Sequence, residues 1–130
     1  MKTRLFFLLM LLALVCACKK VPQAEYDPAN LHLGFWSHAV VNDSVWTFTR
    51  VNKLPLDDYG FVLVRNGLFV ERKNAGFCGT PPITYAEYEG QWEKSGDIMT
   101  IQTRYWGGSQ EYIWKIKHID EQKFAVIKMR

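Results

Sequence analysis

The stretch that decides the fold covers residues 59–73 and reads YGFVLVRNGLFVERK. Two runs rich in aromatic and β-branched residues flank Asn66-Gly67. A two-residue type I′ turn needs positive φ at both central positions, and Asn and Gly tolerate this conformation better than other residues. The sequence therefore predicts a β-hairpin made of strands near residues 59–66 and 67–73.

Strand-like alternation continues on both sides of this hairpin, from Leu33 to the C-terminus, whereas helical periodicity is scarce. Clusters of Asn, Asp, Ser and Gly separate the alternating runs, and such clusters mark turns. Only one connection is long, at residues 74–85. We therefore expect six further strands, near residues 34–41, 45–52, 86–94, 98–105, 110–118 and 123–129.

The alternation also predicts which side chains share a face. Tyr88 and Trp92 fall on one face of their strand, and the neighbouring acids fall on the other. In the strand near 110–118, a second aromatic face contains Tyr112, Trp114, Ile116 and His118. Aromatic residues make up 15% of the chain, which suits strand packing because large rings fill a pleated surface well.

Eight antiparallel strands with short connections must close on themselves or fold over, because open edges invite aggregation. A meander of this size closes most simply as an up-and-down barrel. The predicted fold is therefore all-β, an eight-stranded antiparallel barrel that occupies residues 33–130. An interior of eight strands is either filled by side chains or holds one small ligand.

The N-terminal segment resembles a bacterial lipoprotein signal. A basic start precedes an apolar run from Leu5 to Val15, and Val15-Cys16-Ala17-Cys18 resembles a lipobox. The resemblance implies a signal peptide at residues 1–17 and a lipid on Cys18. The stretch that follows is polar, contains Pro22 and Pro28 and shows no period, which predicts a flexible tether over residues 18–32. Because Lys19 rather than Asp follows Cys18, we expect an anchor in the outer membrane of the cell envelope.

Charge and cysteine content restrict the function further. Without Lys2 and Arg4, which lie in the expected signal peptide, 14 basic residues face 13 acidic ones, so a nucleic-acid partner is not expected. Cys78 then remains as the one unmodified cysteine, and the fold must be stable without an internal disulfide.

The Gly34-Phe35-Trp36 segment at the start of the first strand resembles the Gly-x-Trp signature of lipocalins. Together with the export signal and the meander, it makes the chain similar to the small lipocalin-like lipoproteins of Bacteroidetes. The resemblance implies that Trp36 closes the barrel floor. It also implies that a cation from a late strand, Lys128 or Arg130, packs over the Trp36 ring.

The inward faces supply nine candidates for a ligand-lining wall. Arg50 shares a face with two aromatic residues and is the candidate for binding a ligand carboxylate. The long connection supplies further candidates, because long loops at a barrel mouth often carry function. The wall candidates are Trp36, Trp46, Phe48, Arg50, Phe61, Leu63, Tyr88, Trp92 and Trp114, and the loop candidates are Phe77, Cys78, Gly79, Pro81 and Pro82.

No residue pattern predicts catalysis, a metal site or a cofactor. The three histidines and Cys78 do not stand at ligand spacing, although His38 and His118 would meet if both pointed inward. Cys78 lacks a nearby base. Glu87, Glu89 and Glu93 fall on the outer face, where we expect them to pair with Lys115 or Lys117.

Two functions therefore compete. The first is a lipid-anchored envelope module that holds a small apolar ligand inside the barrel. The second is an interaction or hydrolase-inhibitor module that binds a protein through the 74–85 loop. A void open at one end favours the first function, whereas a filled core with exposed Trp106 and Phe77 favours the second.

Overall fold

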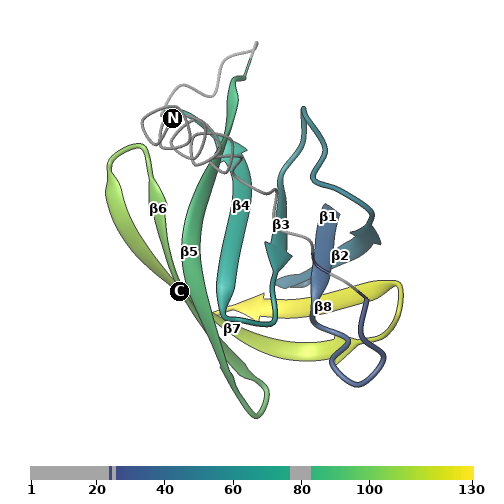
Figure 1. Ribbon diagram of the computed structural model, residues 1–130. Helices are drawn as coiled ribbons and strands as arrows, with labels where there is room; N and C mark the ends of the chain where they lie inside the picture. The colour runs from purple at the N-terminus through teal and green to yellow at the C-terminus, as the bar shows by residue number, and fades with distance from the viewer. Residues whose placement is uncertain (1–23, 25, 77–82) are drawn as a thin grey trace, which may run out of the picture.

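The computed structural model describes residues 24, 26–76 and 83–130, which form an all-β barrel of eight antiparallel strands (Figure 1). The predicted fold class is confirmed. No helix long and apolar enough to cross a membrane occurs in the described part of the chain. The strands are β1 (Gly34–Asn42), β2 (Val45–Val51), β3 (Gly60–Leu63), β4 (Leu68–Asn74), β5 (Tyr85–Ser95), β6 (Ile98–Tyr105), β7 (Gly108–Ile119) and β8 (Lys123–Lys128).

The strand order departs from a simple up-and-down series at one place. Around the barrel the order is β1-β2-β8-β7-β6-β5-β4-β3, so β1 lies between β2 and β3. The β2–β3 connection therefore passes over β1, and Leu54 and Pro55 lie close to Gly60 on the outer face. The hydroxyl of the buried Ser37 donates a hydrogen bond to the Tyr59 carbonyl oxygen at 2.6 Å beneath this connection.

The β3–β4 turn differs from the predicted type. Strand β3 ends at Leu63, and the Val64 amide donates to the Leu68 carbonyl oxygen at 3.0 Å across a longer loop. Gly67 has a positive φ of 87°, whereas Asn66 does not, which excludes a type I′ turn. The Asn66 side chain instead accepts a hydrogen bond from the Leu68 amide at 3.0 Å.

Two successive positive φ values occur at the β1–β2 turn instead. Asp43 and Ser44 have φ of 49° and 69° and join the strands as a two-residue loop. His38, with φ of 53°, marks a register shift in the middle of β1, which bends the strand. Beyond this bulge β1 pairs only with β2.

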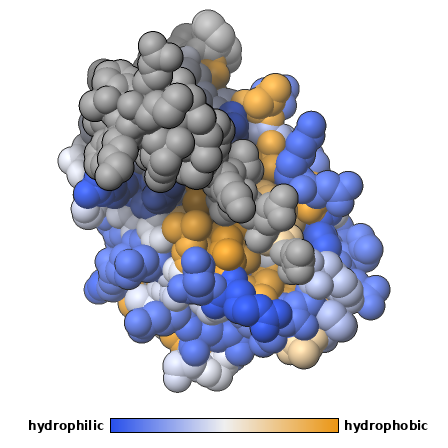
Figure 2. Space-filling view, in the orientation of Figure 1, coloured by the Kyte–Doolittle hydropathy of each residue, from blue (hydrophilic) through white to orange (hydrophobic). Residues whose placement is uncertain are grey.

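The two ends of the barrel differ in their connections. The segment before β1 and the β3–β4, β5–β6 and β7–β8 turns lie at one end, which we call the closed end. The β1–β2 turn, the β4–β5 connection, the β6–β7 turn and the end of β8 lie at the other, which we call the mouth. On the face shown in Figure 2, hydrophobic atoms gather over the region of β3 and β4, with charged residues around them.

The mouth is split between β5 and β6. These strands pair from Ser95↔Ile98 up to Gln91↔Gln102 and then diverge (Figure 1). Beyond that point the first part of β5 pairs with β4, and the last part of β6 pairs with β7. The β4–β5 and β6–β7 hairpins therefore extend past the barrel body as two separate arms.

Candidate functional site

The nine wall candidates separate into three layers along the barrel. Trp36, Leu63, Arg50 and Trp92 lie toward the closed end, Phe48, Phe61 and Trp114 lie in the middle, and Trp46 and Tyr88 lie toward the mouth. Only the last layer is placed to meet a ligand that enters from the mouth.

Trp36 lies at the closed end, as the lipocalin resemblance implies. Its side chain is fully buried, and its indole N–H donates to the His32 carbonyl oxygen at 2.9 Å. The cation over its ring is Arg50 from β2, at 4.2 Å from the ring centroid. The expectation that Lys128 or Arg130 fills this role is wrong, because β8 ends at the mouth.

Arg50 does not lie where a ligand carboxylate would reach it, so that expectation is also wrong. Its guanidinium donates to the carbonyl oxygens of Leu31, Leu33 and Glu121 at 2.6–2.7 Å. Gly34 makes room for it, because a Cβ at Gly34 would lie 2.5 Å from an Arg50 nitrogen. Arg50 therefore holds the segment before β1 and the β7–β8 turn against the barrel end.

The middle layer is packed core rather than a ligand wall. Phe48, Phe61 and Trp114 are fully buried, and their ring centroids lie 4.9–6.0 Å from one another. Leu63 is equally buried toward the closed end. Trp92 is half-buried there, and its indole N–H donates to the Val64 carbonyl oxygen at 2.9 Å. These side chains fill the space that a deep ligand would need.

A buried acid, Glu71, lies above this core on the mouth side. It accepts hydrogen bonds from the hydroxyls of Tyr59 and Tyr112, both at 2.9 Å, and from Thr103 at 3.3 Å. The Lys73 ammonium group lies 2.5 Å from the same carboxylate. A fully buried carboxylate is tolerated because several donors and a cation surround it.

The two tyrosines remain neutral donors in this cluster. Burial, followed by the nearby Glu71 charge, raises the pKa of Tyr59 well above its usual value. The same two causes raise the pKa of Tyr112. The Tyr59 and Tyr112 hydroxyls therefore keep their protons and donate to Glu71 at physiological pH.

Lys128 lies among aromatic rings at the mouth. Its ammonium nitrogen is 3.7 Å from the Trp46 ring centroid and 5.5 Å from the centroids of Tyr59 and Trp114. Burial lowers the pKa of Lys128 to about 8, although the Glu71 charge opposes this shift. Among the described residues, the Lys128 ammonium group at the mouth therefore lacks an ion-pair partner, and the buried Trp114 N–H in the middle layer lacks an acceptor.

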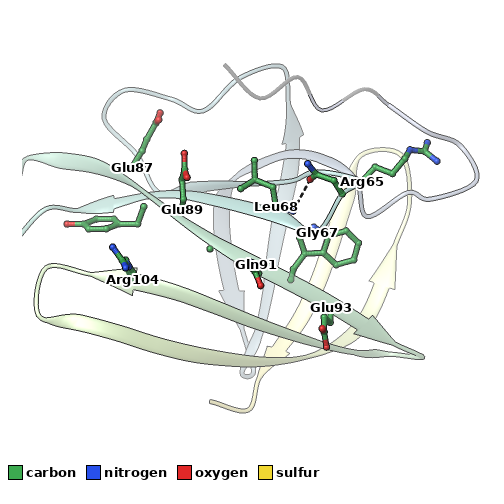
Figure 3. A pocket seen from close by; sticks show the side chains of 12 residues that line it. Arg65, Gly67, Leu68, Glu87, Glu89, Gln91, Glu93 and Arg104 are labelled. Carbon is green, nitrogen blue, oxygen red and sulfur yellow. Dashed lines mark hydrogen bonds between the residues drawn. The ribbon is translucent and has the colours of Figure 1, made fainter. Parts of the chain in front are cut away.

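A groove of about 1060 Å³ runs along the outside of β5 (Figure 3). It extends from the β3–β4 turn at Arg65 to Arg104 on β6, where the barrel wall is split. Glu87 and Glu89 project from β5 in the same direction (Figure 3). Glu87 is paired with Arg72 at 2.7 Å, whereas Glu89 and Arg104 form no ion pair within the described residues.

The expected partners of the outer acids and the expected positions of two histidines differ from those in the structure. The pairing of the outer acids with Lys115 or Lys117 is wrong, since Glu87 pairs with Arg72. His118 does not share the inner face of β7, because a register shift between Ile116 and His118 moves it outward to Asp120, 2.7 Å away. His38 is also exposed and lies 3.1 Å from Asp58, so the two histidines do not meet.

Several residues that the sequence predicts to be functional lie outside the described residues. These are the lipidation site Cys18 and the loop candidates Phe77, Cys78, Gly79, Pro81 and Pro82. Within residues 24, 26–76 and 83–130, no three His, Cys, Asp or Glu side chains are grouped in a way that would hold a metal ion.

Sequence reasoning missed Glu71 and Lys73 as inward-facing residues and expected the inward Lys128 at the wrong end of the barrel, although the alternation contained the signal. Glu71 and Lys73 follow Phe69 at steps of two, and Lys128 follows Phe124 and Val126 in the same way. Their charge suggests an outward position, but strand periodicity directs them into the barrel.

Comparison of the chain with protein-family models, curated proteins and solved structures returned no match. The proposals below therefore stand on the sequence and the geometry of the barrel.

Proposed function

We propose that this protein is a lipid-anchored interaction module of the cell envelope, held in the outer membrane through Cys18, that binds a partner protein at the mouth of its barrel. The role is binding rather than catalysis. The filled core carries this proposal, because Phe48, Phe61 and Trp114 occupy the barrel where an internal ligand would lie. A barrel with a filled interior binds through its rim and outer surface.

Exposed apolar side chains on the mouth connections support the same conclusion. Trp106, in the β6–β7 turn, is 55% exposed, and Ile83, beside the β4–β5 connection, is 39% exposed. Val40 and Val41, near the β1–β2 turn, are more than half exposed. Aromatic and aliphatic residues that protrude in this way are typical anchors of protein interfaces.

Photo-crosslinking in the native host tests this function. A photoreactive phenylalanine analogue is placed at Trp106 or Ile83, and at Ser95 near the closed end as the control. We expect one discrete adduct from the two mouth positions and none from Ser95. The same adduct from all three positions, or no adduct from either mouth position, would refute the proposal.

The Lys128 ammonium group at the mouth, which forms no ion pair among the described residues, favours a second candidate function, the binding of a small amphipathic acid. Its acidic group would accept from Lys128, and its apolar part would lie against Trp46. Native mass spectrometry of protein purified from its own host distinguishes the two functions. A bound acid that is lost in Lys128→Met would support this second candidate, whereas ligand-free protein would exclude it.

A further inference from the structure

We propose that the split between β5 and β6 receives an extended peptide segment of the partner, which pairs as an added strand and presents basic side chains to Glu89. This inference rests on the proposed interaction function and specifies how the partner binds. It starts from the hydrogen-bonding directions of the two diverging strands.

The edge of β5 that faces the split has backbone groups without partners among residues 24, 26–76 and 83–130. The Ala75 amide donates to the Thr84 carbonyl oxygen at 2.7 Å, and the Trp92 amide donates to the Gly67 carbonyl oxygen at 2.9 Å. Because hydrogen-bonding direction alternates along an antiparallel strand, the even-numbered residues between Thr84 and Trp92 face β4. The N–H and C=O groups of Glu87 and Glu89 therefore point toward β6, but strand pairing with β6 begins only at Gln91.

On the β6 side one residue, Arg104, is placed in this way before the strand ends at Tyr105. Gln102 is the last β6 residue that pairs with β5, so by alternation the backbone groups of Arg104 also point into the split. Gly90 lies where the strands diverge, and a Cβ there would lie only 2.1 Å from the Gln102 carbonyl oxygen. The Gln102–Thr103 backbone of β6 therefore still contacts β5 at Gly90, and the free edge lies on β5 at Glu87 and Glu89, where an extended chain would pair as an added strand. Glu87, Glu89, Gly90 and Arg104 all line the groove described above.

Charge identifies the chemistry of the peptide. On the outer face it would lie beside Glu89, which has no ion-pair partner among the described residues, and near Glu87, whose partner is Arg72. Arg104 is the basic residue that lines the groove on the β6 side. On the inner face it would meet Tyr88. A segment that alternates basic residues with small or apolar residues matches both faces. A second copy of this chain fits poorly, because pairing two β5 edges would place the acids of one copy opposite those of the other.

The test uses the full chain in detergent and a fluorescent octapeptide of alternating Lys and Val. We expect saturable binding by fluorescence anisotropy, and slower hydrogen exchange at the Glu87 and Glu89 amides. A Glu-Val octapeptide should bind at least tenfold more weakly. Two further Lys-Val peptides carry N-methyl groups on every second residue, one on the odd-numbered and one on the even-numbered residues. Both keep the charge, but only one of them loses the N–H groups that face β5. That peptide should bind at least tenfold more weakly.

Two variants locate the site. Glu89→Lys should weaken binding of the Lys-Val peptide by about five- to tenfold, whereas Asp57→Lys, an equal charge change on the exposed β2–β3 connection, should leave it unchanged. Equal binding of both N-methylated peptides, or no protection of the two amides, would overturn the proposal. A dimer lost in Glu89→Lys would also overturn it, in favour of a second copy. If Trp106 crosslinks a partner while these peptides fail, the interaction function stands and strand addition does not.

Discussion

Replacement of Trp36 tests whether its buried ring stabilises the closed end of the barrel. The Trp36 side chain is fully buried, donates one hydrogen bond to the His32 carbonyl oxygen, and lies under the Arg50 guanidinium at 4.2 Å. Truncation of a buried Trp to Ala typically lowers the free energy of unfolding by about 3–5 kcal/mol. The cation–π contact and the hydrogen bond each contribute about 1 kcal/mol. We therefore expect Trp36→Ala to lie at the upper end, near 5 kcal/mol.

The loss of unfolding free energy can be measured on a chain of residues 24–130, which keeps the contacts of Tyr26 with Glu121 and of Asp27 with Arg65. Thermal melts followed by far-ultraviolet circular dichroism should show a fall in Tm of about 20–40 °C, or no folded protein at all, because a domain of this size shifts by about 4–8 °C per kcal/mol. Trp36→Phe keeps most of the ring and separates a failed fold from a measurable loss, with about 1–2 kcal/mol expected.

Trp106→Ala is the matched control. The Trp106 ring is 55% exposed at the β6–β7 turn, so its removal should change the free energy of unfolding by less than about 1 kcal/mol. If Trp36→Ala were as mild as Trp106→Ala, the closed end would not depend on this ring, and the argument from Gly34 and Trp36 would fail.

Three other substitutions test the mouth and the anchor. Glu71→Ala should lower the free energy of unfolding in urea by about 3–5 kcal/mol, because it leaves the Lys73 cation without its partner. Glu71→Ala combined with Lys73→Met should recover part of this loss. Equal losses in the single and the double variant would contradict the pairing of Glu71 with Lys73. The pKa of Lys128 falls from 10.5 in the unfolded chain to about 8 in the folded barrel, so the charged form disfavours folding. This loss of folding stability is complete below pH 8. It is relieved between pH 8 and 10.5, where the folded barrel loses the proton before the unfolded chain does. Lys128→Met should therefore raise stability at pH 7 by about 1–2 kcal/mol after solvent screening, and should abolish the increase above pH 8. Cys18→Ala should abolish palmitate labelling in the host, and label that persists in Cys18→Ala but is lost in Cys16→Ala would assign the lipid to the other cysteine.

Strand positions could be predicted from the sequence because one face of each strand packs into a core. Phe48, Phe61 and Trp114 alternate with exposed residues, and this period of two is visible without a structure. The filled interior was one of two open alternatives, since the volume left inside a barrel depends on how rings from different strands interlock.

Strand neighbours and charge partners could not be predicted in the same way. The alternation of side chains along a strand is the same whether β2 pairs with β3 or with β8. The position of β1 between β2 and β3 could therefore not be predicted from the hydrophobic pattern. The single-residue bulge before His118 reversed its face, because one extra residue moves every later side chain to the other side. Arg50 replaced the expected late-strand cation because the direction of β8 places Lys128 at the mouth.

The position of the β1–β2 hairpin also determines how the barrel can fold. Strands β3 to β8 follow one another as neighbours and can pair as the chain emerges, whereas closure requires the first hairpin to insert between β3 and β8. That step joins Val45 to Ile127, residues from opposite ends of the domain, and long-range pairing of this kind is slow because loop closure must precede the contacts. Until it occurs, β3 and β8 each expose an unpaired edge. The yield of folded protein should therefore depend on how fast this one hairpin docks, a kinetic property that native-state stability does not report.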